Sequence, residues 1–488
     1  MPTLTVSDTT KTYHIEFRDT PTVHQVLEQA GIVLSHPCGG RGVCDKCIIR
    51  ISGNISAPDD RELAAGCRLS CRTRLYGDAS VVLSANTPII AEGSAQAIAG
   101  IDLPNTKETY GAAVDLGTTT VVLSVYELIS GSLVASASSL NPQSAISADV
   151  IGRMDAAMHG DLQDMQDRIR TCITALAGET GYLDRIDRFV ITGNTTMLYL
   201  FTGRNPHSLA YAPFRADYLF GETTSFLGKP LYLPECIHAF VGADITCGLL
   251  NSGMCDRNDT ALLCDIGTNG ELALWKEGRL YTASTAAGPV FEGAGISCGC
   301  QSIAGAIEHV TITDNTLTVQ TIGNSPARGI CGSGIIDAVA CLLDKGAIDE
   351  TGAMEEAHVT LCPSVTITQE DIRSIQLAKA AIAAGIKTLL TVTETKEEEI
   401  TTLYIAGGFG SHLHLHSAIR IGLLPEGLRK KIAILGNAAL QGAASFLTDA
   451  SQKEKAHRIV SNATCLNLGG MPEFYEHYIN EMNFPALQ

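Results

Sequence analysis

ALLCDIGTNGELALWK, residues 261–276, determines the fold expected for this chain. The apolar residues before Asp265 predict a buried strand, and a second apolar run begins after the turn. Gly267 and Gly270 bracket a Thr-Asn pair, which is typical of a tight hairpin because glycine adopts positive φ without strain. A carboxylate at the end of a buried strand can hold Mg²⁺ through water. The glycine-rich turn beside it offers N–H groups and hydroxyls to phosphate oxygens.

The same pattern occurs 150 residues earlier in the chain, in GAAVDLGTTTVVLSVYE, residues 111–127. There Asp115 ends the first apolar run, and Gly117 and Thr118 follow it. A further turn and a third strand-like run come after each copy, so the sequence predicts a three-stranded meander used twice. Two carboxylates from duplicated hairpins can face one nucleotide from opposite sides.

Longer strings of the sequence resemble a known superfamily. The two D-[IL]-G-T turns resemble the phosphate-binding motifs of the sugar kinases, heat-shock chaperones and actin. LYIAGGFGS, residues 403–411, is similar to the adenosine motif of that superfamily, and FVGADITCGLLNSG, residues 240–253, resembles its connecting helix. TAAGPVFEGAGIS, GICGSGIID, IQLAKAAIAAG and GNAALQGA resemble one branch, the ferredoxin-fused, ATP-dependent reductive activators of corrinoid proteins. The resemblance covers nearly all of the chain.

The resemblance implies an ATP and Mg²⁺ site between two actin-like, RNase H-like halves. Asp115 and Asp265 are expected to hold the metal, and Asp244 to orient the attacking water. The alternative for Asp244 is a purely structural role as the N-cap of the helix that follows it. The residues expected around the nucleotide are Gly117, Thr118, Thr119, Gly267, Thr268, Asn269, Gly407 and Gly408.

The string HPCGGRGVCDKCIIRISG near the N-terminus contains Cys38, Cys44 and Cys47. A plant-type [2Fe–2S] ferredoxin has the spacing C-x₄-C-x₂-C and a distant fourth cysteine. Here the first gap is one residue longer, as in adrenodoxin-like and activator-like ferredoxins. Cys67 and Cys71 are both candidates for the fourth ligand, and the pattern of the activators favours Cys71. A zinc site is the alternative, but zinc sites usually pair two C-x₂-C knuckles and this segment has one.

Four regions are expected in this α/β chain. Residues 1–88 are predicted to form a β-grasp [2Fe–2S] ferredoxin domain, and residues 89–109 a linker. Residues 110–258 and 259–488 are predicted to be the first and second halves of a duplicated actin-like ATPase domain. The linker is interpreted either as a mobile tether or as an ordinary packed connection.

Composition restricts the partners and the compartment. The net charge of −18 over 488 residues argues against nucleic acid or an anionic membrane as a partner. We expect no membrane span, because no stretch approaches about 18 uninterrupted apolar residues. The N-terminus lacks the basic and apolar regions of a signal peptide, and sixteen cysteines without such a signal indicate reduced thiols or metal ligation. A cytoplasmic protein is expected.

Two further groups of possible metal ligands occur in the second half. His412, His414 and His416 alternate, as a metal site on one face of a strand would require. No carboxylate or cysteine accompanies them in the sequence, so an exposed polar loop is favoured. Cys298 and Cys300 are too few for a second cluster within one chain. A cluster shared across a dimer interface stays open.

Four functions compete. The resemblance favours transfer of one electron from the ferredoxin cluster to Co(II) of a corrinoid protein, restoring Co(I), with ATP hydrolysis as the driving force. A low-potential electron donor and a homodimer are then expected. A plant-type cluster lies near about −400 mV, and an acceptor roughly 200 mV lower would cost about 4.6 kcal/mol per electron, which gives ATP a role. The alternatives are an activator of another low-potential enzyme, a small-molecule kinase with a regulatory ferredoxin, and a nucleotide-controlled redox switch without turnover.

Overall fold

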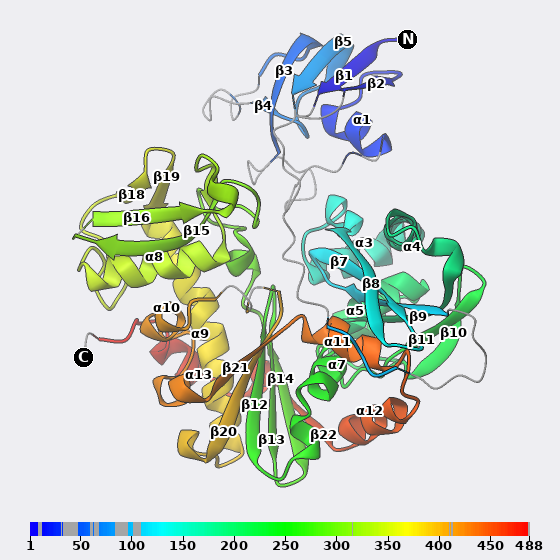
Figure 1. Ribbon diagram of the computed structural model, residues 1–488. Helices are drawn as coiled ribbons and strands as arrows, with labels where there is room; N and C mark the ends of the chain where they lie inside the picture. Colours follow the sequence, from blue (N-terminus) through cyan, green and yellow to red (C-terminus); the bar gives the residue numbers. More distant parts are fainter. Residues whose placement is uncertain are drawn as a thin grey trace.

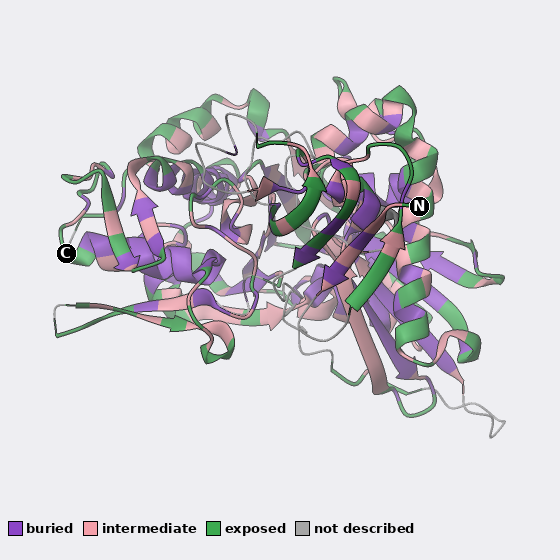
Figure 2. Cartoon of the chain, turned by 90° about the horizontal axis from the view of Figure 1, so that it is seen from above, coloured by how far each residue is buried: buried purple, intermediate pink, exposed green. Residues whose placement is uncertain are grey.

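The computed structural model describes residues 1–7, 12–30, 32, 47–58, 62, 68–82, 96–100, 109–314, 316–408, 410 and 413–486. The described residues form one five-stranded sheet near the N-terminus, two six-stranded sheets, and two smaller sheets (Figure 1). Buried side chains are concentrated in these sheets and in the helices packed on them (Figure 2).

The N-terminal unit is a sheet of order β2-β1-β5-β3-β4 with one helix. Its elements are β1 (Thr3–Ser7), β2 (Thr12–Glu16), α1 (Val23–Gln29), β3 (Ile48–Ile55), β4 (Arg68–Leu69) and β5 (Leu75–Val82). Apolar residues of α1, among them Val23 and Leu27, share one buried cluster with Leu4 and Val81 of the strands. A mixed sheet closed on one face by a helix is the β-grasp arrangement, as predicted.

The first actin-like half has a sheet of order β10-β11-β9-β6-β7-β8. Its strands are β6 (Tyr110–Leu116), β7 (Thr120–Glu127), β8 (Ser132–Leu140), β9 (Ile186–Gly193), β10 (Glu222–Phe226) and β11 (Lys229–Leu233). Its helices are α3 (Val150–Ala156), α4 (Leu162–Glu179), α5 (Thr195–Thr202), α6 (His207–Ala210) and α7 (Ala243–Ser252), with a short 3₁₀ helix η1 (Pro142–Ala145).

The second half repeats this plan in a sheet of order β21-β20-β12-β13-β14-β22. Its strands are β12 (Thr260–Ile266), β13 (Gly270–Lys276), β14 (Arg279–Thr285), β20 (Ile400–Ala406), β21 (Ile432–Gly436) and β22 (Ala463–Leu466). Its helices are α8 (Gly332–Asp344), α9 (Gln369–Val392), α10 (Leu415–Arg420), α11 (Ala438–Ser445), α12 (Ser451–Ser461) and α13 (Pro472–Asn480), and it has a 3₁₀ helix η5 (Pro289–Glu292). An added layer contains β15 (Ala306–Thr313), β16 (Thr316–Thr321), β17 (Gly329–Ile330), β18 (His358–Cys362) and β19 (Val365–Thr368).

The duplicated meander is confirmed. β6, β7 and β8 pair antiparallel in succession, and so do β12, β13 and β14. In both halves the first strand of the meander also pairs in parallel with a later strand, β9 in one half and β20 in the other. Because the carboxyl ends of β6 and β12 carry the two D-[IL]-G-T turns, the topology brings each turn to the equivalent edge of its sheet.

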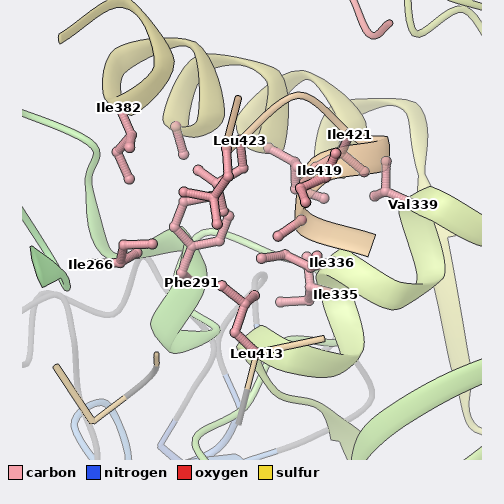
Figure 3. Close-up of a cluster of buried hydrophobic side chains, with 14 of the residues drawn as sticks. Ile266, Phe291, Ile335, Ile336, Val339, Ile382, Leu413, Ile419, Ile421 and Leu423 are labelled. Carbon is pink, nitrogen blue, oxygen red and sulfur yellow. The ribbon is translucent and has the colours of Figure 1, made fainter. Parts of the chain in front are cut away.

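α9 is the central helix of the second half. By length and composition it is apolar enough to cross a membrane, but 78% of its apolar window is buried inside the protein. It begins with a capping box, in which Thr368 and Asp371 satisfy each other's backbone N–H groups. Figure 3 shows Ile382 of α9 in one apolar cluster with Ile266, Phe291 and residues of α8. The helix is therefore a core element of the fold.

α7 and α11 join the two halves. A Cβ added to Gly442 of α11 would lie 2.0 Å from the carbonyl oxygen of Cys247 in α7, so only glycine allows these helices to approach so closely. α11 follows β21 in the second half, yet its Leu440 and Ala443 pack in one cluster with Ala113 and Val190 of the first sheet. The second half thus supplies part of the cover of the first sheet.

Part of the predicted linker is packed. Ile98 N–H donates to Gly131 O at 2.8 Å, and Gln96 N–H donates to Gln441 Oε1 at 3.0 Å. Residues 96–100 therefore lie against the first half and α11, which favours the packed connection over the mobile tether for this part. The rest of residues 89–109 lies outside the described residues, apart from Thr109.

Candidate functional site

A cavity of about 280 Å³ lies between the two halves. All of the residues predicted to surround the nucleotide and its metal line this cavity: Asp115, Gly117, Thr118, Thr119, Asp244, Asp265, Gly267, Thr268, Asn269, Gly407 and Gly408. Further polar side chains that were not assigned from the sequence line it as well, among them Glu271, Glu292 and Asn437. Residues more than 300 positions apart are thus brought into one site.

The first turn is held by side chains of its own half. Asn141 Nδ2 donates to Gly117 O at 2.8 Å, and the Asn141 N–H donates to Thr119 O at 2.8 Å. Arg153 is fully buried and donates from Nη2 to Thr118 O at 2.7 Å. Burial lowers the pKa of Arg153 to about 9. These donors occupy the carbonyl oxygens of the turn, and they therefore hold its backbone in one conformation.

The second turn is closed by its own backbone and by the Gly407 segment. Gly267 N–H donates to Asn269 O at 3.0 Å. Gly407 has φ +91, and a Cβ there would lie 2.5 Å from Asp265 Oδ1. A Cβ on Gly408 would meet nothing within 4 Å. Gly407 is therefore required by the approach of the protein's own carboxylate, whereas Gly408 leaves open space on the cavity side.

Glu292 connects the two turns. Its Oε1 accepts a hydrogen bond from Thr268 Oγ1 at 2.6 Å, and its Oε2 accepts one from Thr119 Oγ1. One carboxylate of η5 thus bridges a hydroxyl from each half. Glu292 is the only charged residue of TAAGPVFEGAGISCGC, residues 285–300, and that isolation was the signal in the sequence that it has a special place.

Four carboxylates are crowded at the floor of the cavity. Burial raises the pKa of Asp115 to about 6, with Asn437 Nδ2, which donates to its Oδ2 at 2.9 Å, acting in the opposite direction. Burial and the neighbouring Asp115 raise the pKa of Asp265 to about 7. Burial raises the pKa of Glu271 well above its usual range, with Asp244 and Asp265 adding to the shift. Such a set of hard oxygen donors suits Mg²⁺, whose charge would offset the repulsion.

Asp244 is not an N-cap. α7 begins at Ala243 with Gly242 as its N-cap, which provides no side-chain capping bond. Asp244 lies in the first turn of α7, where its Oδ1 accepts from the N–H of Ile245 at 2.9 Å. Burial, followed by the charge of Asp265, raises the pKa of Asp244 to about 8. The N-cap assignment considered for this residue is therefore wrong; its carboxylate accepts a backbone N–H of the first turn and lines the cavity.

Two further residues of the site were not assigned from the sequence, although Glu271 lies within the predicted hairpin. Glu271 lies opposite Asp265 in the β12–β13 register, and only this pairing places it beside the predicted metal ligand. Asn437 is the N-cap of α11, with Oδ1 accepting from Leu440 N–H at 2.9 Å, while its Nδ2 reaches Asp115 in the other half. In the sequence, Asn437 indicates only the start of a helix and not a contact with Asp115.

Two of the predicted cluster ligands meet in the N-terminal unit. Cys47 precedes β3 and Cys71 follows β4, and these strands pair so that Ile48 lies opposite Leu69. The two Sγ atoms are 3.3 Å apart. The hydrogen bond between the two thiols is the largest cause that lowers the pKa of the Cys47 thiol, to about 6. Two converging thiols at one edge of the unit fit ligation of one iron by both.

A buried glutamate shapes the segment that carries Cys71. Glu62 Oε1 accepts from the N–H of Leu69 at 2.8 Å and from Thr73 Oγ1 at 3.1 Å. These bonds hold the turn between β4 and β5 on both sides of Cys71. The other predicted ligands, Cys38 and Cys44, and the rival fourth ligand Cys67 lie outside the described residues.

The remaining cysteines show no second cluster within the described part of the chain. Neither Cys298 nor Cys300 belongs to a group of three potential metal ligands there. Cys236, Cys247 and Cys264 are fully buried, and burial raises the pKa of each thiol. They behave as small apolar side chains.

The histidine segment agrees in part with the favoured polar loop, because His414 and His416 are exposed. His412 lies outside the described residues, His416 Nδ1 lies 3.2 Å from Arg429 Nη1, and the segment leads into α10 instead of forming a strand. His414 has a carboxylate partner, because its Nδ1 lies 3.0 Å from Asp337 Oδ2. The expectation that no carboxylate accompanies these histidines was wrong, since Asp337 is 77 residues away in sequence.

Family models match nearly the whole chain. A model described as "2Fe-2S iron-sulfur cluster binding domain" matches residues 6–76, one described as "RACo middle region" matches residues 110–257, and one described as "C-terminal domain of RACo the ASKHA domain" matches residues 259–488. The matches assign a [2Fe–2S] cluster to the N-terminal unit and ATP to the domain built from the two halves.

Curated relatives and a solved structure agree with these matches. The chain is 34% identical over 423 residues to the corrinoid activation enzyme RamQ of Eubacterium limosum, covering 78% of this chain and 71% of that protein. It is 29% identical over 345 residues to the Co(II) methylated amine-specific corrinoid protein reductase of Methanosarcina barkeri, covering 62% of this chain and 63% of that protein.

A solved structure, "Reductive activator for corrinoid,iron-sulfur protein", has a TM-score of 0.72 and 25% sequence identity, and the match covers 99% of this chain and 98% of that chain. Its likeness extends over the N-terminal unit and both halves. The chain therefore belongs to the family of reductive activators of corrinoid proteins, in which a [2Fe–2S] domain is joined to an ASKHA-type ATPase domain.

Proposed function

We propose that this protein restores a corrinoid protein from Co(II) to Co(I) by passing it one electron from a [2Fe–2S] cluster, with ATP hydrolysis as the driving force. The observation that carries the proposal is the 34% identity to a corrinoid activation enzyme over most of both chains. The nucleotide cavity and the converging Cys47 and Cys71 supply the two chemical parts in one chain.

The nucleotide site is proposed to work through the buried carboxylates. Asp115 and Asp265 would hold Mg²⁺ through water. The turns carrying Gly117 and Gly267 would present N–H groups and the hydroxyls of Thr118, Thr119 and Thr268 to the phosphates, with Asn269 at the tip of the second turn. Gly408 offers space for the nucleoside beside Gly407. Bound Mg²⁺ supplies charge neutralisation for phosphoryl transfer to water.

Asp244 is proposed to orient the attacking water. It lies on α7 and lines the cavity, and the charges of both Asp265 and Asp115 act on it. Without a cation its raised pKa favours the protonated acid. A cation between Asp115 and Asp265 would favour the ionised form, which can accept a hydrogen bond from water. Binding of the cation would thus convert Asp244 to the ionised form that its proposed role requires.

The N-terminal unit is proposed to hold its cluster through Cys38, Cys44, Cys47 and Cys71. The cluster supplies one-electron transfer at low potential. We further propose a low-potential electron donor, a homodimeric assembly and a cytoplasmic location, with no nucleic acid or membrane as partner. The proposed regions remain residues 1–88, 89–109, 110–258 and 259–488.

Coupling requires that ATP binding and hydrolysis change the affinity for the corrinoid protein. A nucleotide that binds two states of the protein equally cannot shift their populations. The cavity lies between the halves, and Glu292 bridges their turns, so occupation by phosphates can change how the halves meet. That change is the proposed link between nucleotide and electron transfer.

The product of ATP cleavage tests this function directly. The protein with its cluster assembled is incubated with ATP and Mg²⁺, with and without a Co(II) corrinoid protein, and inorganic phosphate is measured. We expect phosphate release that the corrinoid protein stimulates. Transfer of the phosphoryl group to a small-molecule acceptor would instead identify a kinase, and nucleotide binding without any phosphate release would identify a switch.

The cluster ligands can be tested separately. Cys71→Ser should lose or strongly alter the cluster, because Cys71 lies beside Cys47, whereas the matched variant Cys67→Ser should keep it. Iron content and the visible absorption spectrum decide. The opposite pair of results would move the fourth ligand to Cys67.

A further inference from the structure

α8 lies along an edge of β15 that, among the described residues, has no partner strand over most of its length. β15 pairs with β17 only at Ala306 and Ile307. Beyond that point, two side chains one helical turn apart on α8 form hydrogen bonds with backbone groups of β15. Ser333 Oγ donates to Glu308 O at 2.9 Å, and Asp337 Oδ2 accepts from Val310 N–H at 3.4 Å. Asp337 is therefore placed at the strand edge by the packing of α8.

A histidine from β15 and one from the α10 start meet at this carboxylate. The register of β15 and β16 shifts between Ile307 and His309, and this irregularity accompanies the turn of His309 toward α8. His309 Nδ1 lies 3.1 Å and His414 Nδ1 lies 3.0 Å from Asp337 Oδ2. The two imidazoles stack with ring centroids 4.2 Å apart and planes inclined by 22°.

The carboxylate is buried and only partly satisfied. Asp337 has no exposed surface, and among the described residues its Oδ1 has no hydrogen-bond partner. Both imidazole nitrogens and the Val310 N–H converge on Oδ2 instead. A buried carboxylate oxygen without a partner is unfavourable, and a cation bound to this carboxylate would offset that cost.

We propose that His309, Asp337 and His414 bind a divalent transition-metal ion of the zinc class. One potential ligand atom from each residue lies within 4.8 Å of the others. Two atoms bound to one zinc ion at about 2.0–2.2 Å with near-tetrahedral angles are separated by about 3–3.5 Å. The two nitrogen–oxygen distances of 3.1 and 3.0 Å match that separation.

The ligand set selects the kind of ion. Two imidazoles and one carboxylate suit zinc and its neighbours in the first transition series, whereas Mg²⁺ and Ca²⁺ prefer oxygen ligands alone. The side chains of His309 and His414 are 26% and 51% exposed, so an ion has a route from solvent and a fourth position for water. This site is therefore chemically distinct from the all-carboxylate floor of the nucleotide cavity.

The proposed ion would connect α8 to the segment that follows Gly407 and Gly408. His414 follows Gly408 by six residues, and its neighbour Leu413 lies in the same apolar cluster as Ile335 and Ile336 of α8 (Figure 3). Ser333, in the first turn of α8, lines the nucleotide cavity. An ion at Asp337 thus joins β15, α8 and the segment after Gly408, and its role would be structural support beside the nucleotide.

Zinc binding to the full chain tests the proposal. The protein with its cluster assembled is freed of loose metal, and Zn²⁺ is titrated in competition with a chromogenic chelator. We expect one zinc equivalent whose affinity falls by more than about 100-fold in His309→Gln and in His414→Gln, because each removes a ligand. His416→Gln is the matched control in the same segment and should leave that affinity unchanged.

X-ray absorption at the zinc edge supplies a second readout. We expect nitrogen and oxygen neighbours with a histidine signature in the wild type, and loss of that signature in both ligand variants. Equal zinc affinity in wild type, His309→Gln and His414→Gln would overturn the site. A sulfur shell would also overturn it, because it would place the bound zinc on cysteines. The two histidines carry the test because Asp337 also covers the edge of β15, so its substitution could prevent folding.

Discussion

The two phosphate turns have the same backbone plan and different surroundings. Asp115 and Asp265 both end the first strand of a meander, yet Asp115 accepts a hydrogen bond from Asn437, while Asp265 faces Asp115 and the Gly407 backbone. Hydrogen bonds from Asn141 and Arg153 hold the backbone of the first turn. The two turns therefore share one topology, but more hydrogen bonds support the first turn, and burial and neighbouring charge raise the pKa of Asp265 in the second turn further than that of Asp115 in the first.

Asp244 should give the largest effect, because it belongs to neither turn and is the carboxylate proposed to orient the attacking water. We expect Asp244→Ala to lower ATP hydrolysis by about 100-fold or more, the contribution typical of a positioned acid or base. Reduction of the cluster by a chemical donor should be unchanged. Phosphate release and cluster absorbance are measured on the same sample. Hydrolysis at the wild-type rate would leave α7 without a catalytic role.

Asp265→Asn, in the second turn, should lower ATPase activity and raise stability. Asn is nearly isosteric and removes one of the crowded charges, so we expect hydrolysis to fall by about tenfold or more while the nucleotide-free protein melts at a higher temperature near pH 8. Asp115→Asn is the matched variant, and its stability gain should be smaller because Asn437 already offsets that charge. A lower melting temperature for Asp265→Asn would contradict the repulsion.

Glu292→Ala should weaken the connection between the turns. It removes the hydrogen bonds from Thr119 and Thr268, and we expect the KM for ATP to rise by about tenfold with a smaller change in kcat, because Glu292 is placed to position the turns. Glu355→Ala, at an exposed carboxylate of the second half, is the control. A fall in kcat alone would instead place Glu292 at the reacting atoms.

The smallest effect is a pH dependence of stability. The pKa values of Asp115, Asp265 and Asp244 are about 6, about 7 and about 8, all above the ordinary value of 3.8. The folded protein therefore holds protons that the unfolded chain has lost, and this stabilisation disappears as the pH rises through those values. We expect the nucleotide-free protein to melt at a lower temperature at about pH 8.5 than at about pH 6.

Mg²⁺ and nucleotide should reverse this trend. Their binding requires ionised carboxylates, so the stabilisation that they add should be larger at about pH 8.5 than at about pH 6. Melting curves with Mg²⁺ and ADP at both pH values measure it. The same added stabilisation at both pH values would show that these carboxylates do not face the metal.

Local patterns predicted the duplicated meander, and the family resemblance that they carry implied the fold and many of the residues that line the cavity. The D-[IL]-G-T turns, the Gly-Gly pair and the cysteine spacing each lie within a few residues. Asn437 and Glu271 could not be predicted in this way, because a helix start and a strand register bring them to Asp115 and Asp265. His309 and Asp337 were missed for the same reason: only the packing of α8 on β15 makes them neighbours of His414.

The central claim is that ATP drives the electron to the corrinoid. The most direct measurement is Co(I) formation, followed by corrinoid absorbance, with a low-potential reductant present and with or without ATP. We expect Co(I) to accumulate with ATP in the wild type, and Asp244→Ala with ATP to behave as the wild type does without it. Equal Co(I) yield in the presence and absence of ATP would contradict the account.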